Sequence, residues 1–372
     1  MSDPTGGAPL VPEPQPEPKR AGARVAANVP GRRGGRPARV GRGAGAPRDR
    51  FRINRAILPT LAALAIFIAM LVFGQLRYGH IFQYSTLSNL VINNAQMIIL
   101  AVGLTFVIIT GGIDLSVGAV VALSSVSGVL LSQQGWPAAV AVPIMIGIGL
   151  ACGLLSGTLV RFFGVQPFIA TLAVMFLARG LASMLSTKPV RLPDGSGILA
   201  LGEPIKLVDG PKVNDLTVSA GVIIAAVVVV VAYFLLQRTR FGRTIYAIGG
   251  SEQSAELMGL PVQRTKLLIY ALSGTLSGIA AVVFTARLGI AQNITGLGWE
   301  LDAIASTVIG GTLLTGGAGY VLGSVVGSLV LGLMVVLITR DGGVPPEATT
   351  IITGGILLMF VVLQRAVVRQ RK

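Results

Sequence analysis

Acidic and amide side chains interrupt the long apolar stretches of this chain at only a few places. One acidic residue lies in GGIDLSVGAV at 111–120, and two more lie in GWELDAIAS at 298–306. A carboxylate at membrane depth costs about 2.5–3.5 kcal/mol on insertion scales, so it usually faces a cavity or a protein partner. Three amides precede another apolar run. The candidates for a polar pathway are therefore Asn93, Asn94, Gln96, Asp114, Glu300 and Asp302.

The sequence contains none of the common motifs in which catalytic or ATP-binding residues occur at fixed spacings. None of the six lysines stands in a G-x-x-x-x-G-K-[ST] phosphate loop, and there is no H-E-x-x-H or G-x-S-x-G. Glu300 and Asp302 are two residues apart and point to different faces of a helix, which argues against a general acid/base pair. With one histidine, His80, and one cysteine, Cys152, no metal site and no internal disulfide are expected. We therefore expect a non-catalytic chain without a cofactor.

Composition places the chain in the membrane. It is 52% hydrophobic and 12% charged, with a mean hydropathy of +0.76, whereas soluble domains carry about 25% charged residues. Apolar runs of about 20 residues predict membrane helices. The fold class is therefore all-α, a polytopic helical bundle, with predicted spans at 56–74, 89–110, 116–133, 137–160, 167–186, 218–236, 266–287, 300–316, 318–339 and 349–367.

Ten is an even number of spans, so both termini lie on the same side of the membrane. The distribution of basic residues indicates that this side is the cytoplasm. By this count 22 Lys and Arg residues are cytoplasmic and seven lie outside, while Arg179 stays within a span. Polar residues mark the starts of segments 89–110 and 300–316, so either segment could span or re-enter.

The N-terminal segment differs from the rest. Twelve of the 30 basic residues lie between Lys19 and Arg55, and residues 1–55 also contain nine prolines and nine glycines. Such a segment cannot bury enough apolar surface to offset its conformational entropy. We expect 1–55 to be a disordered basic cytoplasmic tail with possible contact to anionic lipid but not nucleic acid, and 56–372 to form the transmembrane domain.

Two loops are long enough to carry structure of their own. Residues 187–217 contain four prolines and face outside in this topology. Residues 237–265 face the cytoplasm, and Ser251 can cap a short helix that has Glu252 in its first turn and stops at Gly259-Leu260-Pro261. Its apolar side has nothing within the loop to pack against, so the helix either lies on lipid or inserts into another protein.

A second Gly-rich stretch resembles the first. Shifting the chain by 199 positions aligns 111–130 with 310–329 at ten identical residues, among them Gly111 with Gly310 and Gly112 with Gly311. Interrupted hydrophobic segments at corresponding places in two halves indicate a transport pathway at the repeat interface. The predicted bundle therefore has an internal repeat of broken helices. The two copies run parallel by this count, or inverted if a neighbouring segment re-enters.

Three motifs resemble a known family. GGIDLSVG, RTRFGRTIYAIGGSEQSAELMGL and GWELDAIASTVIGGTLLTGGAG, in this order, resemble the permease subunit of ribose-type bacterial ABC sugar importers. Within that family, FGRTIYAIGG, LMGL and ELDAIASTVIGGTLLTGG resemble the galactofuranose branch. The resemblance covers about 85–365. It implies a multi-pass inner-membrane protein that carries a monosaccharide and works with a cytoplasmic ATPase, an outside sugar-binding protein and a second permease copy or paralogue.

The resemblance also implies that the cytoplasmic loop helix docks on the ATPase. The expected coupling residues are Gly249, Gly250, Ser251, Glu252, Ala255, Glu256, Leu257, Met258, Gly259 and Leu260. An alternative function remains, in which an ion-coupled secondary transporter binds H⁺ or Na⁺ at Asp114, Glu300 and Asp302.

Each pathway candidate keeps a structural alternative. Asp114 can cap a helix start rather than line the pathway. Glu300 and Asp302 can orient a broken segment, with Arg179 or Arg287 as charge partners, rather than contact sugar hydroxyls. The amides of Asn93, Asn94 and Gln96 suit a neutral sugar because they donate and accept, but hydrogen bonds between helices explain them equally well.

Overall fold

The computed structural model describes residues 58–208, 215–342, 351–355, 358, 359 and 362. The predicted tail 1–55 lies outside the described residues, as does most of the predicted span 349–367. The longer helices are α1 (Leu58–Tyr78), α2 (Tyr84–Ile109), α3 (Val117–Gln133), α4 (Ala138–Phe162), α5 (Pro167–Leu185), α7 (Ala220–Arg238), α10 (Val262–Leu288) and α12 (Val321–Asp341).

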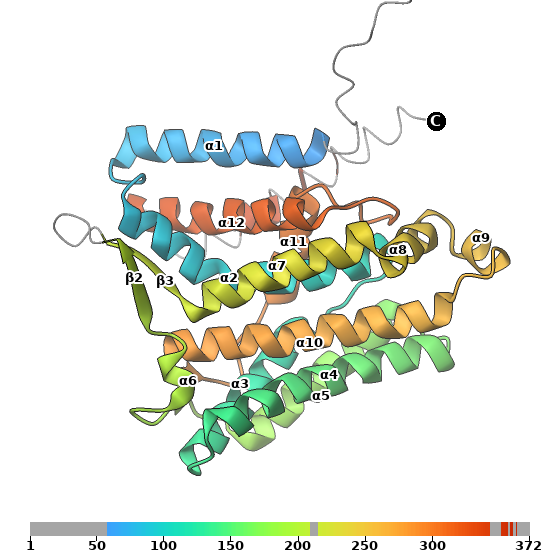
Figure 1. Cartoon of the computed structure of the whole chain (residues 1–372), viewed down its shortest axis with the longest axis horizontal. Helices are drawn as coiled ribbons and strands as arrows, with labels where there is room; N and C mark the ends of the chain where they lie inside the picture. The colour runs from blue at the N-terminus through green and yellow to red at the C-terminus, as the bar shows by residue number, and fades with distance from the viewer. Residues whose placement is uncertain (1–57, 209–214, 343–350, 356–357, 360–361, 363–372) are drawn as a thin grey trace, which may run out of the picture. The chain divides into compact units, whose positions relative to one another are not determined.

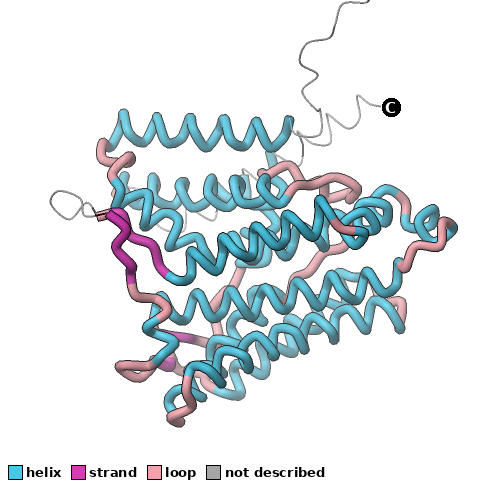
Figure 2. Tube along the Cα trace, viewed as in Figure 1, coloured by secondary structure: helices cyan, strands magenta, loops and turns pink. Residues whose placement is uncertain are grey.

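Short elements connect these helices. They are the helices α6 (Gly197–Ala200), α8 (Arg240–Gly250), α9 (Glu252–Leu257) and α11 (Trp299–Ile309), and the strands β1 (Val190–Arg191), β2 (Pro204–Val208), β3 (Leu216–Ser219) and β4 (Ile290–Ala291). Strand β1 pairs antiparallel with β4, and β2 with β3. These small sheets add to the predicted all-α bundle without changing its class (Figure 2).

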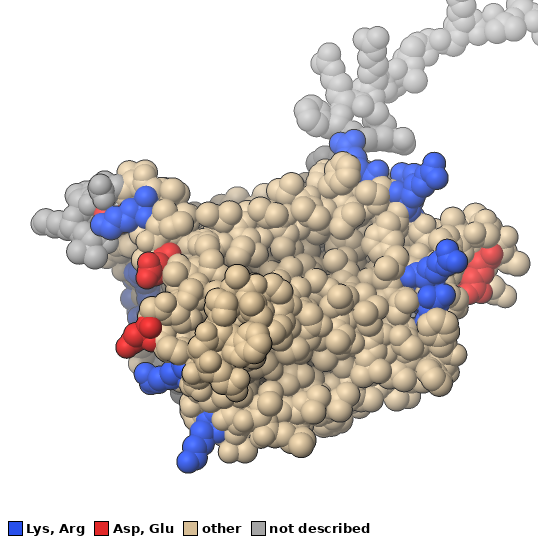
Figure 3. Space-filling view, turned by 60° about the horizontal axis from the view of Figure 1, so that its bottom comes forward, with Lys and Arg blue, Asp and Glu red and all other residues tan. Residues whose placement is uncertain are grey.

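The long helices lie alongside one another, with the loops gathered at two opposite ends (Figure 1). Strands β2 and β3 and helix α6 mark one end, and α8 and α9 mark the other. The loops 187–217 and 237–265 therefore lie at opposite ends, as the predicted topology requires. On the face shown in Figure 3, charged side chains lie at the two ends and an uncharged band separates them. An apolar band of this kind is what a lipid bilayer covers.

Seven of the described helices are long and apolar enough to cross a membrane, and they correspond to seven predicted spans. The predicted segment 89–110 lies within α2, whose 26 residues form one continuous helix. The predicted segment 300–316 is different, because α11 has 11 residues and ends at Ile309. At a rise of 1.5 Å per residue it is about 16 Å long, too short to cross a hydrocarbon core of about 30 Å. A continuous helix over 300–316 is therefore not formed, and the count of ten spans stays a prediction.

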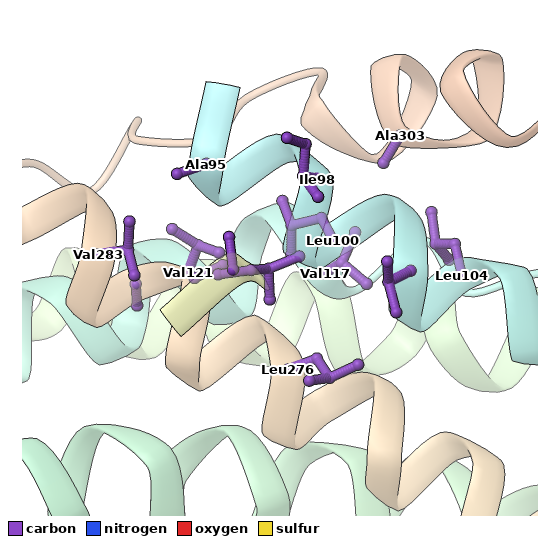
Figure 4. Packing of buried hydrophobic residues seen from close by; sticks show 14 of the residues in the cluster. Ala95, Ile98, Leu100, Leu104, Val117, Val121, Leu276, Val283 and Ala303 are labelled. Carbon is purple, nitrogen blue, oxygen red and sulfur yellow. The ribbon is translucent and has the colours of Figure 1, made fainter. Parts of the chain in front are cut away.

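Helices α2 and α10 form the centre of the core. Side chains of α2 (Leu100, Leu104) and α10 (Leu276, Val283) meet those of α3 and α11 (Figure 4). Helix α10 also packs closely on α4, where a Cβ added to Gly153 would overlap the Tyr270 carbonyl oxygen. Small residues permit this approach of two backbones in membrane bundles. The two central helices therefore provide a fixed frame for the interrupted segments beside them.

Both Gly-rich stretches interrupt helices. The first break, residues 110–116, separates α2 from α3, and the second break, residues 310–320, separates α11 from α12. The breaks touch each other, because the Gly317 N–H donates to the Ile109 carbonyl at 2.8 Å. Helices α3 and α12 both run from their breaks toward the β2–β3 end, where Gln133 bonds to Arg191 and Asp341 to Tyr78. The two Gly-rich stretches therefore lead into helices that run parallel, which is the first of the two predicted arrangements. The internal repeat itself stays a prediction.

Candidate functional site

Asp114 lies within the first break, and its carboxylate accepts three hydrogen bonds. Its side chain is 1% exposed. Its Oδ1 accepts from the Ser116 N–H at 2.9 Å and the Ser116 hydroxyl at 2.6 Å, and its Oδ2 accepts from the Ser273 hydroxyl at 2.7 Å. Hydrogen bonds to an ionised group are among the stronger ones in proteins. This carboxylate therefore joins the start of α3 to α10, which favours the structural alternative over a lining role.

Glu300 and Asp302 lie in the first turn of α11, where the helix dipole favours negative charge. A Cβ on Gly118 would lie 2.7 Å from the Glu300 Oε2 and would overlap the Gly296 carbonyl oxygen, so the first turns of α3 and α11 meet here. The N-cap residue of α11 is Gly298, which has no side chain to cap the helix. The Glu300 Oε2 is buried without a hydrogen-bond partner among the described residues.

Of the two arginines predicted as charge partners of these acids, Arg179 interacts electrostatically with Glu300, but both arginines donate their hydrogen bonds to other groups. Arg179 on α5 donates to the carbonyl oxygens of Asn293 at 2.7 Å and Thr295 at 2.6 Å. Arg287 on α10 donates to the Asn93 Oδ1 at 2.7 Å. Arg179 therefore fastens the chain that leads into α11, and Arg287 fastens α10 to α2.

The three amides of α2 point in different directions. Asn93 is exposed beside Arg287, whereas Gln96 is buried and donates to the Asn93 carbonyl at 2.7 Å. Asn94 packs against Gly332 of α12 and donates to the Leu90 carbonyl. A cavity of about 140 Å³ brings Asn94 together with Asp302, Thr353 and apolar side chains of α2 and α12. Asn94 and Asp302 thus line one cavity, but the six pathway candidates do not all form one cluster.

Helix α9 forms as the sequence predicts. The Ser251 hydroxyl accepts from the Ser254 N–H at 3.2 Å, and Glu252 stands in the first turn. Gly259 has a φ of 74°, a conformation that glycine adopts at little cost, and ends the helix. Lys266 at the start of α10 pairs with Glu252 at 2.5 Å. These contacts fix α9 to α10.

The apolar side of α9 is divided between two surroundings. Ala255 is buried with Ile248 and Val262, and Leu260 packs against this group. The expectation that the helix has nothing within the loop to pack against was therefore wrong for Ala255 and Leu260. Leu257 and Met258 are 85% and 67% exposed. These two side chains form the outward apolar surface of α9.

The sequence analysis missed helix α8 and the contacts that it makes. Thr239 caps this helix by accepting from the Gly242 N–H, and Phe241, Ile245 and Ile248 follow at helical spacing on its inner side. That cap and spacing were the available signal. A Cβ on Gly249 would overlap the Ile109 carbonyl oxygen and lie 2.5 Å from the Gly317 nitrogen. Gly249 is thus packed against the meeting point of the two breaks, whereas Gly250 is exposed.

Comparisons with known proteins agree with this architecture. Residues 86–362 match the model of a family described as "Branched-chain amino acid transport system / permease component". The chain is 55% identical to the fructose import permease protein FruG of Bifidobacterium longum over 87% of this chain and 95% of that one.

Two further relatives come from Escherichia coli. The inner membrane ABC transporter permease protein YjfF is 37% identical over 83% of this chain and 92% of that one. The ribose import permease protein RbsC is 37% identical over 74% of this chain and 83% of that one.

The contacts of Asp114 predict what its replacement does. Asp114→Leu leaves the Ser116 N–H, the Ser116 hydroxyl and the Ser273 hydroxyl without their acceptor, at about 1–3 kcal/mol for each buried unsatisfied group. We expect the variant to lose folded protein, measured as the monodisperse fraction in gel filtration after membrane extraction. Asp114→Asn keeps the size and an acceptor oxygen and is the matched control. Normal amounts of folded Asp114→Leu protein that fails only in uptake would contradict the structural role.

Proposed function

This chain belongs to the branched-chain amino acid transport system permease family, and from that premise we propose that it is the membrane subunit of an ATP-driven sugar importer. The observation that carries the sugar assignment is the 55% identity with a fructose import permease across nearly the whole of both chains. The resemblance to a ribose import permease agrees with it. The family description names amino acids, whereas the names of these two relatives state that they import sugars. We therefore propose a monosaccharide as the substrate, with fructose before ribose- or galactofuranose-like sugars.

The polar groups of α2, α10 and α11 support a neutral, hydroxyl-rich substrate. Asn93 and Arg287 meet at an exposed position, and Asn94 and Asp302 share the cavity described above. Amide groups donate and accept, and the charged partners supply further donors and acceptors for hydroxyl groups.

The energy source in this proposal is a separate ATPase. The sequence has no phosphate loop, and Leu257 and Met258 offer an exposed apolar surface at the α8–α9 end. Exposed apolar patches mark protein or membrane contacts. We assign this surface to the ATPase, so the α8–α9 end is cytoplasmic, and we propose that both termini are cytoplasmic as well. The β2–β3 end then faces the outside sugar-binding protein, and a second permease copy or paralogue completes the importer in the bacterial inner membrane.

Transport by the reconstituted importer tests the sugar assignment. We expect proteoliposomes that contain the chain, its ATPase and its binding protein to accumulate labelled fructose when ATP is enclosed with the ATPase. Labelled ribose, galactose and leucine should be measured in parallel. ATP-dependent uptake of leucine without uptake of any sugar would contradict the proposal, and uptake driven by an ion gradient without the ATPase would favour the secondary transporter.

A pair of charged substitutions tests the docking surface. Leu257→Asp with Met258→Asp should detach the ATPase, because two carboxylates would be buried without partners in an apolar contact. The measurement is co-purification of the ATPase with the permease. Ile205→Asp with Leu207→Asp on β2 is the matched control, since those side chains are 48% and 57% exposed at the opposite end. Gly259→Trp is less informative, because its strain would come from the backbone φ of 74° whether or not a partner docks.

Equal ATPase recovery with the Leu257/Met258 variant and with the wild-type chain would overturn the docking assignment. The surface of α9 would then be a contact with lipid.

A further inference from the structure

Tyr246 connects three segments through its hydroxyl group. The hydroxyl donates to the carbonyl oxygen of Gly319 at 2.6 Å, and the Gln237 amide donates to the hydroxyl oxygen at 3.0 Å. Gln237 belongs to α7, Tyr246 to α8, and Gly319 to the second break. The side chain therefore joins the segment that carries α9 to the interrupted span.

The carbonyl that Tyr246 holds lies two residues from the contact between the breaks. The Gly317 N–H donates to Ile109 at the end of α2, and Gly249 of α8 lies against both residues. Helix α8 therefore makes two kinds of contact with the second break. One is a contact between backbones, which transmits a push, and the other is a directional hydrogen bond, which can also transmit a pull.

The Tyr246 hydroxyl keeps its donor role at physiological pH. Burial raises the pKa of Tyr246 to about 12, against an ordinary value near 10. The group therefore stays protonated at neutral pH and can donate its hydrogen bond to the Gly319 carbonyl oxygen.

We propose that Tyr246 is the positioning residue through which movement of α8 and α9 reaches the second break. The inference rests on the proposed function, because it takes α9 as the ATPase docking site. A push on α9 passes to α8 through the packing of Ala255 on Ile248. Helix α8 then displaces Gly319 and the backbone that continues into α12. Without the hydroxyl, the ATPase stays docked, but the movement that its closing imposes on α9 displaces Gly319 and α12 less.

Tyr246→Phe tests this role, because it removes one oxygen and leaves the ring. Loss of a hydrogen bond worth about 0.5–1.5 kcal/mol should lower sugar transported per ATP hydrolysed by about two- to twelvefold. ATPase co-purification should stay at the wild-type amount. Tyr233→Phe is the matched control, since Tyr233 lies on neighbouring α7 and is 39% exposed.

The outcomes show whether Tyr246 passes movement to the second break or only anchors the docking segment. An unchanged ratio of sugar to ATP in Tyr246→Phe would overturn the inference, and so would loss of the bound ATPase, which would show that Tyr246 only anchors the docking segment. If Tyr246→Phe does not give folded complex, Gln237→Leu decides, because it removes only the bond that orients the hydroxyl. A fall in that ratio with Gln237→Leu supports the inference, and no change overturns it. A wild-type chain that binds no ATPase would instead overturn the proposed function.

Discussion

The contact of backbones at the meeting point of the two breaks is the constraint on which the rest of the structure depends. The end of α2, the second break and α8 approach there so closely that a Cβ on Gly249 would overlap the Ile109 carbonyl oxygen. In a bilayer, interrupted backbone must be satisfied within the protein because no water is present. The hydrogen bond from Gly317 to Ile109 provides part of this satisfaction. The two interrupted segments therefore satisfy part of each other's backbone where they meet.

The polar groups of the bundle follow from this constraint. Asp114 closes the first break by binding Ser116 and Ser273, and Arg179 holds the carbonyls that precede α11. These charged side chains stabilise irregular backbone, a use of costly intramembrane groups that is separate from substrate contact. We propose that Asn93 with Arg287 and Asn94 with Asp302 contact the transported molecule. In this proposal the bundle divides its polar residues between supporting the breaks and forming the pathway.

The sequence predicted the class of fold, the eight longer helices, both breaks and helix α9 with its cap, because hydropathy, glycine and capping residues act locally. It did not predict that α11 would end at Ile309, since the apolar run continues through Gly310 and only tertiary contacts determine where the helix stops. Helix α8 was missed because its short amphipathic pattern lies among charged residues. The separation of Asn93 from Asn94 follows from the different neighbours, Arg287 and Gly332, that α10 and α12 bring to adjacent positions. No local pattern contains that information.

Comparing Gly249→Ala with Gly250→Ala in the permease purified alone tests the central claim most directly, through the apparent melting temperature in detergent. The two glycines are adjacent in α8, but a Cβ on Gly250 meets nothing within 4 Å. Overpacking costs about 1–3 kcal/mol, so Gly249→Ala should melt several degrees lower than the wild-type chain. Gly250→Ala should match the wild-type chain or melt slightly higher, because alanine favours helix more than glycine does. Equal melting temperatures for the two variants would contradict the close contact of α8 with the two breaks.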